Sequence, residues 1–218
     1  MKKLQLLMAI LVVTSLTSLT AQEITYGGKA GLNLSSFSGD ETDDLSSRAS
    51  FHLGILAELE ISEKFSFQPE VLYSSVGTKY DLGGSVDGFT FQNEGTIKLD
   101  YLTVPLLAKY YVTEGLSIEA GPQIGFLLSA NQEFESTQPT GEDGSGGTTS
   151  GDQDVKDLYS GFDLALGVGA GYKLDNGLHF SLRYNLGLSN ILDIDDVDTS
   201  DFSRQNSVFQ FSIGYFFL

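Results

Sequence analysis

The stretch SGFDLALGVGAGYKLDNGLHFSLRYNLGLSN, residues 160–190, decides the fold of this chain. In each half, bulky apolar residues alternate with small or polar ones, as in Leu166-Gly167-Val168. Alternation with a period of two indicates a β-strand whose two faces meet different surroundings. The connection between the halves, 175–176, is short enough for a tight turn. The stretch therefore predicts an antiparallel hairpin of two long strands.

The same alternation recurs along most of the chain. Eight segments carry it, at 26–36, 50–60, 65–76, 97–111, 116–130, 160–174, 177–190 and 207–218. Long connections (37–49, 77–96, 131–159 and 191–206) alternate with short ones (61–64, 112–115 and 175–176). Short turns at one end and long loops at the other are typical of bacterial outer-membrane barrels, and a soluble β-sandwich has no reason to sort its loops in this way.

Strand length and the nature of the polar face favour the same class. The segments have 11 residues or more, whereas soluble strands average about 5–6 and a tilted strand crosses a bilayer with about 9–11. The polar faces are rich in Gly and Ser, which suits a crowded barrel interior. We predict an all-β fold, an eight-stranded antiparallel up-and-down transmembrane β-barrel. Pro69, Pro105 and Pro122 fall within strands, where we expect bulges or bends.

The N-terminus predicts export. Two lysines precede an apolar run, 4–19, and a small residue, Ala21, follows it. This pattern predicts a signal peptide at 1–21 and a barrel domain at 22–218; the alternative is an N-terminal membrane anchor, for which the run is short. The chain contains no Cys, which excludes a lipid-anchored lipoprotein, disulfides and thiolate metal sites.

The chain is strongly acidic, with a net charge of −17. Loss of Lys2 and Lys3 leaves 10 basic against 29 acidic side chains, a net charge of −19. Binding to nucleic acid through its phosphates is therefore excluded. The acidic residues gather in long connections, at 40–44, 133–157 and 193–201. We interpret them as solvated loops; the alternative is divalent-cation binding, free or bridging to lipopolysaccharide phosphates. The run 193–198 lacks the Gly and the distal Glu of an EF-hand, so we predict no calcium site there.

The polar faces of the strands would line the barrel lumen. The predicted lumen residues are Lys29, Asn33, His52, Glu58, Gln68, Glu70, Lys109, Glu119, Gln123, Asp163, Lys173, His179, Arg183, Asn185 and Gln210. An eight-stranded barrel is just wide enough for side chains to fill, and buried charges should be paired. We predict a structural network of Lys29, Glu70, Lys109, Glu119, Gln123, Asp163 and Arg183, with Lys109 and Arg183 joined to Glu70 and Glu119. The alternative is a gated or narrow polar channel that uses the same residues.

Nothing in the sequence predicts an enzyme, a cofactor or a metal site. The two histidines, His52 and His179, fall inside the predicted wall. The glycines of 167–171 resemble a nucleotide-binding motif in letters alone, because their alternation places them on a lumen face. The connection 131–159 is the largest irregular region expected, and its Gly-rich part, 141–151, should be mobile; it serves either as a solvent cover or as an adhesive or receptor surface.

Five stretches carry a family resemblance: the signal end Thr20-Ala21-Gln22, and residues 26–33 (YGGKAGLN), 67–73 (FQPEVLY), 101–110 (YLTVPLLAKY) and 119–125 (EAGPQIG). With them the chain resembles the PorT-like outer-membrane β-barrel proteins of Bacteroidota. The last strand resembles the C-terminal signal read by the barrel assembly machinery, although Leu218 follows the expected terminal Phe217. The resemblance implies an eight-stranded barrel of the size of the OmpA and OmpX barrels and little about activity. The name-giving member is linked to type IX secretion.

These observations together predict a cell outer-membrane protein of a Gram-negative bacterium. We expect a structural or interaction role at the cell surface or beside a secretion complex; the alternative is a small-solute or ion pore. The expected partners are outer-membrane lipid and lipopolysaccharide, the barrel assembly machinery during biogenesis, and a secretion-complex or surface protein.

Overall fold

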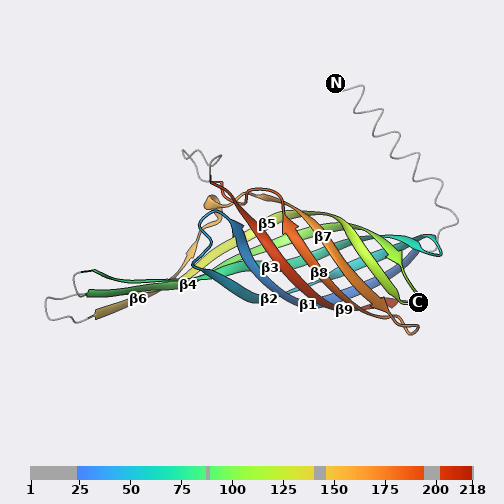
Figure 1. Cartoon of the computed structure of the whole chain (residues 1–218), viewed down its shortest axis with the longest axis horizontal. Helices are drawn as coiled ribbons and strands as arrows, with labels where there is room; N and C mark the ends of the chain where they lie inside the picture. Colours follow the sequence, from blue (N-terminus) through green and yellow to red (C-terminus); the bar gives the residue numbers. More distant parts are fainter. Residues whose placement is uncertain (1–23, 87–88, 140–145, 194–201, 218) are drawn as a thin grey trace, which may run out of the picture.

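The computed structural model describes residues 24–86, 89–139, 146–193 and 202–217. They form nine strands and one short 3-10 helix (Figure 1). The elements are β1 (Ile24–Gly39), β2 (Leu45–Ser62), β3 (Phe65–Val86), β4 (Phe89–Tyr111), β5 (Leu116–Pro139), β6 (Gly146–Asp154), η1 (Lys156–Leu158), β7 (Phe162–Lys173), β8 (Leu178–Gly187) and β9 (Arg204–Phe217). No helix in these ranges is long and apolar enough to cross a membrane. The predicted signal peptide lies outside the described residues.

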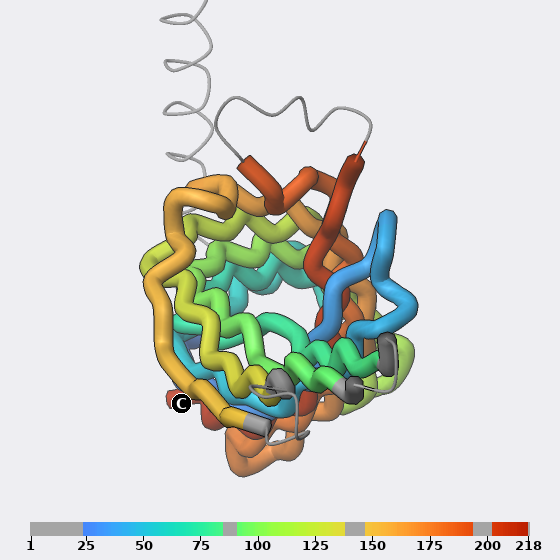
Figure 2. The backbone as a smooth tube through the Cα atoms, turned by 90° about the vertical axis from the view of Figure 1, so that its left-hand side faces the viewer, coloured from blue at the N-terminus to red at the C-terminus, as the bar shows by residue number. Residues whose placement is uncertain are grey.

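Eight of the strands close into a ring (Figure 2). The order is β4-β3-β2-β1-β9-β8-β7-β5, and pairing of β4 with β5 closes it. Every neighbouring pair in the ring is antiparallel. The first and last strands meet along a seam that runs from Tyr26 opposite Phe217 to Gly39 opposite Arg204. The predicted eight-stranded up-and-down barrel is therefore confirmed, and β6 lies outside the ring.

Two connections that we expected to be irregular are strands. Residues 77–96 continue β3 and β4, which pair as far as Val86 opposite Phe89. Much of 131–159 continues β5 and forms β6, paired as far as Pro139 opposite Gly146. The four strands project beyond the ring as one sheet, which we call the extension (Figure 1). The prediction was wrong because polar composition does not prevent pairing: antiparallel neighbours satisfy the backbone groups whatever the side chains are.

The two faces of the wall are sorted as in a membrane barrel. On β9, Phe209, Phe211 and Ile213 are 48–51% exposed, whereas Gln210 and Ser212, on the other face, are at most 7% exposed. The bulky apolar side chains thus point out of the ring, and the polar ones point into it. Such an inside-out arrangement is stable where the surroundings are lipid.

The strand prolines sit side by side without bulges. Pro69 lies opposite Leu106 on β4, and Pro105 lies opposite Gln123 on β5, next to Pro122. The pairing of β4 with β3 is interrupted between Pro69 and Leu72, and its pairing with β5 is interrupted between Pro105 and Ala108. Both pairings resume in the same register. The expected bulges are therefore absent here, and the register shifts of the wall lie elsewhere, at Ser47/His52, Glu60/Ser62 and Asp100/Tyr101. Because proline has no N–H to donate, the ladder is interrupted without being displaced.

Candidate functional site: the polar lumen

The lumen contains every residue that the sequence placed there. Fourteen of the fifteen are at most 8% exposed, and the last, Lys173, is partly buried at the end of β7. The inward positions of β3 show how the lumen changes along the barrel axis: Gln68 and Glu70 are followed by Leu72, Ser74, Val76 and Thr78. The charged part of the lumen therefore gives way to a part lined by uncharged side chains, both polar and apolar.

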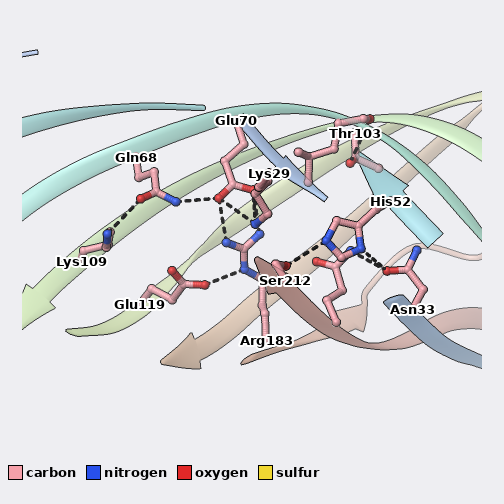
Figure 3. Close-up of polar contacts among 12 residues, drawn as sticks. Lys29, Asn33, His52, Gln68, Glu70, Thr103, Lys109, Glu119, Arg183 and Ser212 are labelled. Carbon is pink, nitrogen blue, oxygen red and sulfur yellow. Dashed lines mark hydrogen bonds and ion pairs between the residues drawn. The ribbon is translucent and has the colours of Figure 1, made fainter. Parts of the chain in front are cut away.

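Arg183 is the centre of the ionic part (Figure 3). Its Nη1 and Nη2 donate to both carboxylate oxygens of Glu70 at 3.0 and 2.9 Å, and its Nε donates to Glu119 at 2.7 Å. Lys29 Nζ also donates to both oxygens of Glu70, at 3.1 and 3.0 Å. Such charge-assisted, bidentate pairs are the strongest hydrogen bonds available to side chains. The four residues come from β8, β3, β5 and β1, so the cluster links strands across the lumen.

The glycine stripe of β7 makes room for this cluster. Gly169 lies between Glu119 on β5 and Arg183 on β8 in the strand register. A Cβ at Gly169 would come within 2.5 Å of the Leu182 carbonyl oxygen and 3.2 Å of Arg183 Cβ. Among the glycines that looked like a nucleotide motif in letters, Gly169 is therefore a place where an added side chain would collide with the wall.

Lys109 belongs to a neighbouring cluster and not to the predicted partners. Its Nζ donates to Glu58 Oε1 at 3.2 Å and to Gln68 Oε1 at 2.9 Å. Gln68 Nε2 in turn donates to Glu70 at 2.7 Å, so Lys109 reaches the Arg183 cluster only through an amide. The Tyr111 hydroxyl also donates to Glu58. The expected direct pairing of Lys109 with Glu70 and Glu119 was wrong.

The cluster around Glu58 is completed by aromatic contacts. Lys173 Nζ lies 3.6 Å from Glu58 Oε2, and the same nitrogen lies 4.7 Å from the centroid of the Phe216 ring. Lys109 Nζ lies 5.8 Å from that centroid. Cations over an aromatic face are stabilised by its quadrupole, so Phe216 helps to hold two lysines beside one carboxylate.

A neutral layer follows along the axis. His52 bonds through its two ring nitrogens with Asn33 Oδ1 and Ser212 Oγ, both at 2.8 Å. Asn33 Nδ2 donates to Ser74 Oγ at 3.0 Å, and Gln210 Nε2 donates to Asn33 Oδ1 at 3.1 Å. These contacts join β1, β2, β3 and β9 without any charge.

Two members of the predicted network lie apart from the ionic clusters. Asp163 accepts hydrogen bonds from Ser189 Oγ at 3.0 Å and from Asn206 Nδ2 at 3.1 Å. Gln123 lines a small cavity beside Asp163. The structure thus brings together Lys29, Glu70, Glu119 and Arg183. It connects Lys109 to them through Gln68, and it leaves Gln123 and Asp163 apart from them, beside the small cavity.

An apolar plug, which we did not predict from the sequence, lies at the end of the lumen that faces the extension. The plug consists of Phe37, Val76, Leu99, Tyr101, Leu127, Ala130, Val155, Tyr159, Ile191 and Val208, each at most 9% exposed. Val155, Tyr159 and Ile191 come from connections between strands, where Tyr159 bridges to Leu192. Burial raises the pKa of Tyr159 to about 12, so its hydroxyl is protonated at neutral pH. The available signal was the apolar residues in otherwise polar connections.

The described lumen offers no assembled catalytic centre and no cluster of histidine or acidic metal ligands. No group of three or more His, Asp or Glu in the described ranges is placed to hold a metal ion. His52 is bonded to an amide and a hydroxyl, and His179 packs edge-on against Phe216. Neither contact is that of a general base oriented by a carboxylate.

A closed antiparallel barrel with an apolar exterior and a polar, filled interior defines the class of bacterial outer-membrane proteins. A family model described as "Outer membrane protein beta-barrel domain" matches residues 20–193. The chain therefore belongs to this family of outer-membrane β-barrel proteins, and the outer membrane is its location. The narrower PorT-like resemblance stays a prediction.

Several solved barrels resemble the chain. Ail of Yersinia pestis, the attachment invasion locus protein, is 11% identical, with 89% of this chain and 99% of that chain covered and a TM-score of 0.46. Neisserial surface protein A is 12% identical, with coverage of 89% and 99% and a TM-score of 0.40. OprG of Pseudomonas aeruginosa is 14% identical, with coverage of 89% and 94% and a TM-score of 0.36. A comparison with curated protein sequences found no match.

Proposed function

We propose that this barrel has a structural or interaction role at the cell surface and that it does not conduct solutes. The observation that carries the proposal is the filled lumen, with two ionic clusters and a neutral layer below an apolar plug. The network in the lumen pins strands together, because it joins side chains from non-neighbouring strands. In this proposal, the surface beyond the plug makes the functional contacts.

A groove outside the ring supports the interaction role. It has a volume of about 500 Å³ and lies between the β1–β2 connection and the extension. Its lining combines acidic, basic and apolar residues: Glu41, Asp43, Asp44, Leu45, Tyr80, Leu82, Asn93, Ile97, Gln132 and Arg204. Apolar surface beside carboxylates suits a protein segment with apolar and basic side chains. The partner would be a surface protein or a component of a secretion complex, in line with the PorT-like resemblance.

The second candidate is a small-solute or ion pore, which the polar lining of the lumen favours. We expect the barrel, extracted from membranes in detergent and inserted into a planar bilayer, to show no steady single-channel openings. A heat-dependent gel shift would verify that the inserted protein is folded. Steady openings whose ion selectivity changes in Glu119→Gln and Arg183→Met, but not in Lys98→Met outside the lumen, would overturn the proposal and establish the pore.

Export with removal of residues 1–21 is part of the same proposal, as are contacts with lipopolysaccharide and with the barrel assembly machinery. The apolar outward face of β9 suits insertion into lipid. We expect the protein purified from outer membranes to begin at Gln22, as read by N-terminal sequencing or intact mass. A protein that retains Met1–Ala21 would instead indicate an N-terminal anchor.

A further inference from the structure

A small cavity lies in the lumen between the neutral layer and the apolar plug. Its volume is about 10 Å³, close to the least that holds one water-sized ligand. The polar residues of its lining come from six strands, namely Ser74, Tyr101, Thr103, Gln123, Asp163, Asn185, Asn206 and Gln210. Neither the ionic clusters nor the groove on the surface involves this cavity.

The lining is rich in buried oxygen atoms without a hydrogen-bond partner among the described residues. They are Gln123 Oε1, Asn185 Oδ1, Asn206 Oδ1 and Gln210 Oε1, on side chains that are 2–8% exposed. Two of the amides are oriented by their nitrogens: Asn206 Nδ2 donates to Asp163, and Gln210 Nε2 donates to Asn33. Asn185 Nδ2 is also buried without a partner, and the hydroxyls of Ser74 and Tyr101 accept hydrogen bonds from Asn33 and Asn206. Four buried oxygens without a partner in one cavity suit a ligand that supplies positive charge.

Asp163 is the acidic side chain among the described residues of this lining. It is 6% exposed, and its side-chain hydrogen-bond partners are the neutral groups of Ser189 and Asn206. The cationic side chains of the described lumen form ion pairs with other carboxylates. Arg183 and Lys29 pair with Glu70 and Glu119, and Lys109 and Lys173 pair with Glu58. A buried carboxylate without a cation is costly, and a cation bound in the cavity would remove this cost.

We propose that the cavity binds one monovalent metal cation, Na⁺ or K⁺, through the carboxylate of Asp163 and the amide oxygens of Gln123, Asn206 and Gln210. Hard cations prefer oxygen ligands of this kind. One carboxylate with neutral oxygens matches a single positive charge, whereas protein sites for Ca²⁺ collect several carboxylates. The bound ion ties β5, β7 and β9 together at the level where the ionic clusters end.

The test compares heat unfolding of the detergent-extracted barrel in NaCl, KCl and choline chloride at one ionic strength. Choline is too large for the cavity, so Na⁺ or K⁺ should raise the unfolding midpoint saturably by a few degrees while choline does not, because a ligand bound only by the folded state stabilises it. Asp163→Asn should abolish the difference between salts. Asp100→Asn, which alters another carboxylate that accepts from a serine, should preserve it. Equal midpoints in all three salts would mean that the cavity holds water alone.

A second measurement does not depend on the variants folding. Crystals of the unaltered protein grown or soaked in Tl⁺ should show an anomalous-scattering peak within the cavity, beside Asp163 and Gln123. Na⁺ in excess during the soak should reduce that peak if the two ions share the site. Ordered density without an anomalous signal would identify water and overturn the proposal.

Discussion

Replacement of Arg183 by methionine should lower the free energy of unfolding by about 3–5 kcal/mol, the cost of removing one partner from a buried ionic cluster. Arg183 is 1% exposed and supplies three hydrogen bonds to two carboxylates. Without it, Glu119 loses its ion pair and Glu70 retains only Lys29. Two buried negative charges would then face one cation. The measurement is urea unfolding of the barrel in lipid vesicles. Circular dichroism and the heat-dependent gel shift monitor the unfolding, because the chain has no tryptophan for fluorescence.

Three further variants test whether the cluster is the cause. Lys98→Met breaks an ion pair whose side chains are 33% and 48% exposed, and it should cost less than about 1 kcal/mol. Arg183→Lys keeps the charge but loses the bidentate geometry, so its loss of unfolding free energy should lie between those of Lys98→Met and Arg183→Met. Glu119→Ala should lower the heat-unfolding temperature by less than Arg183→Met does, because Arg183 then keeps Glu70. If Arg183→Met lowered the free energy of unfolding no more than Lys98→Met does, the result would contradict a stabilising network.

Substitution of Gly31 by alanine should disturb the seam between β1 and β9. A Cβ at Gly31 would lie 1.9 Å from the Phe211 carbonyl oxygen and 2.7 Å from His52 Cε1. The carbonyl belongs to the backbone of β9 and cannot rotate away, so the two strands must separate locally. Overpacking of this kind costs about 1–3 kcal/mol, and occasionally more. We expect a lower unfolding free energy and slower appearance of the folded band during refolding.

Gly28 on the same strand provides the matched control. Its Cβ would meet only the Gly54 carbonyl oxygen, at 3.7 Å, which is an ordinary contact. Gly28→Ala should therefore change the unfolding free energy little, or raise it slightly through reduced freedom of the unfolded chain. If both alanine variants behaved alike, the close approach at Gly31 would not be a constraint on barrel closure.

The barrel could be predicted from the sequence because its signal is local. Period-two alternation identifies each strand, and alternation of connection lengths identifies the two ends. The same alternation placed lumen residues such as Glu70, Arg183 and Gln123 on the inner face. The extension could not be predicted in this way, because the Gly, Ser and acidic residues of 77–96 and 131–159 have the composition of loops, while their backbone forms paired strands.

The contacts inside the lumen could not be predicted in the same way. Alternation says that Lys109 faces inward, but not that it meets Glu58 instead of Glu119. Partners across the lumen depend on the tilt and stagger of the strands, and these are properties of the closed ring. The plug could not be predicted for the same reason. Its connection residues Val155, Tyr159 and Ile191 are distant in sequence from the strand residues with which they cluster.

The sequence by itself therefore determined the class of protein, the number of strands in the ring and the face on which each side chain lies. All three follow from the two-residue period of a strand and from the difference between lipid and a polar interior. Only the tertiary structure decided which charges pair, how the lumen is closed and where an acceptor-rich cavity remains around Asp163. Those features arise from the register around a closed ring, because contacts across it join residues whose separation in sequence carries no local signal.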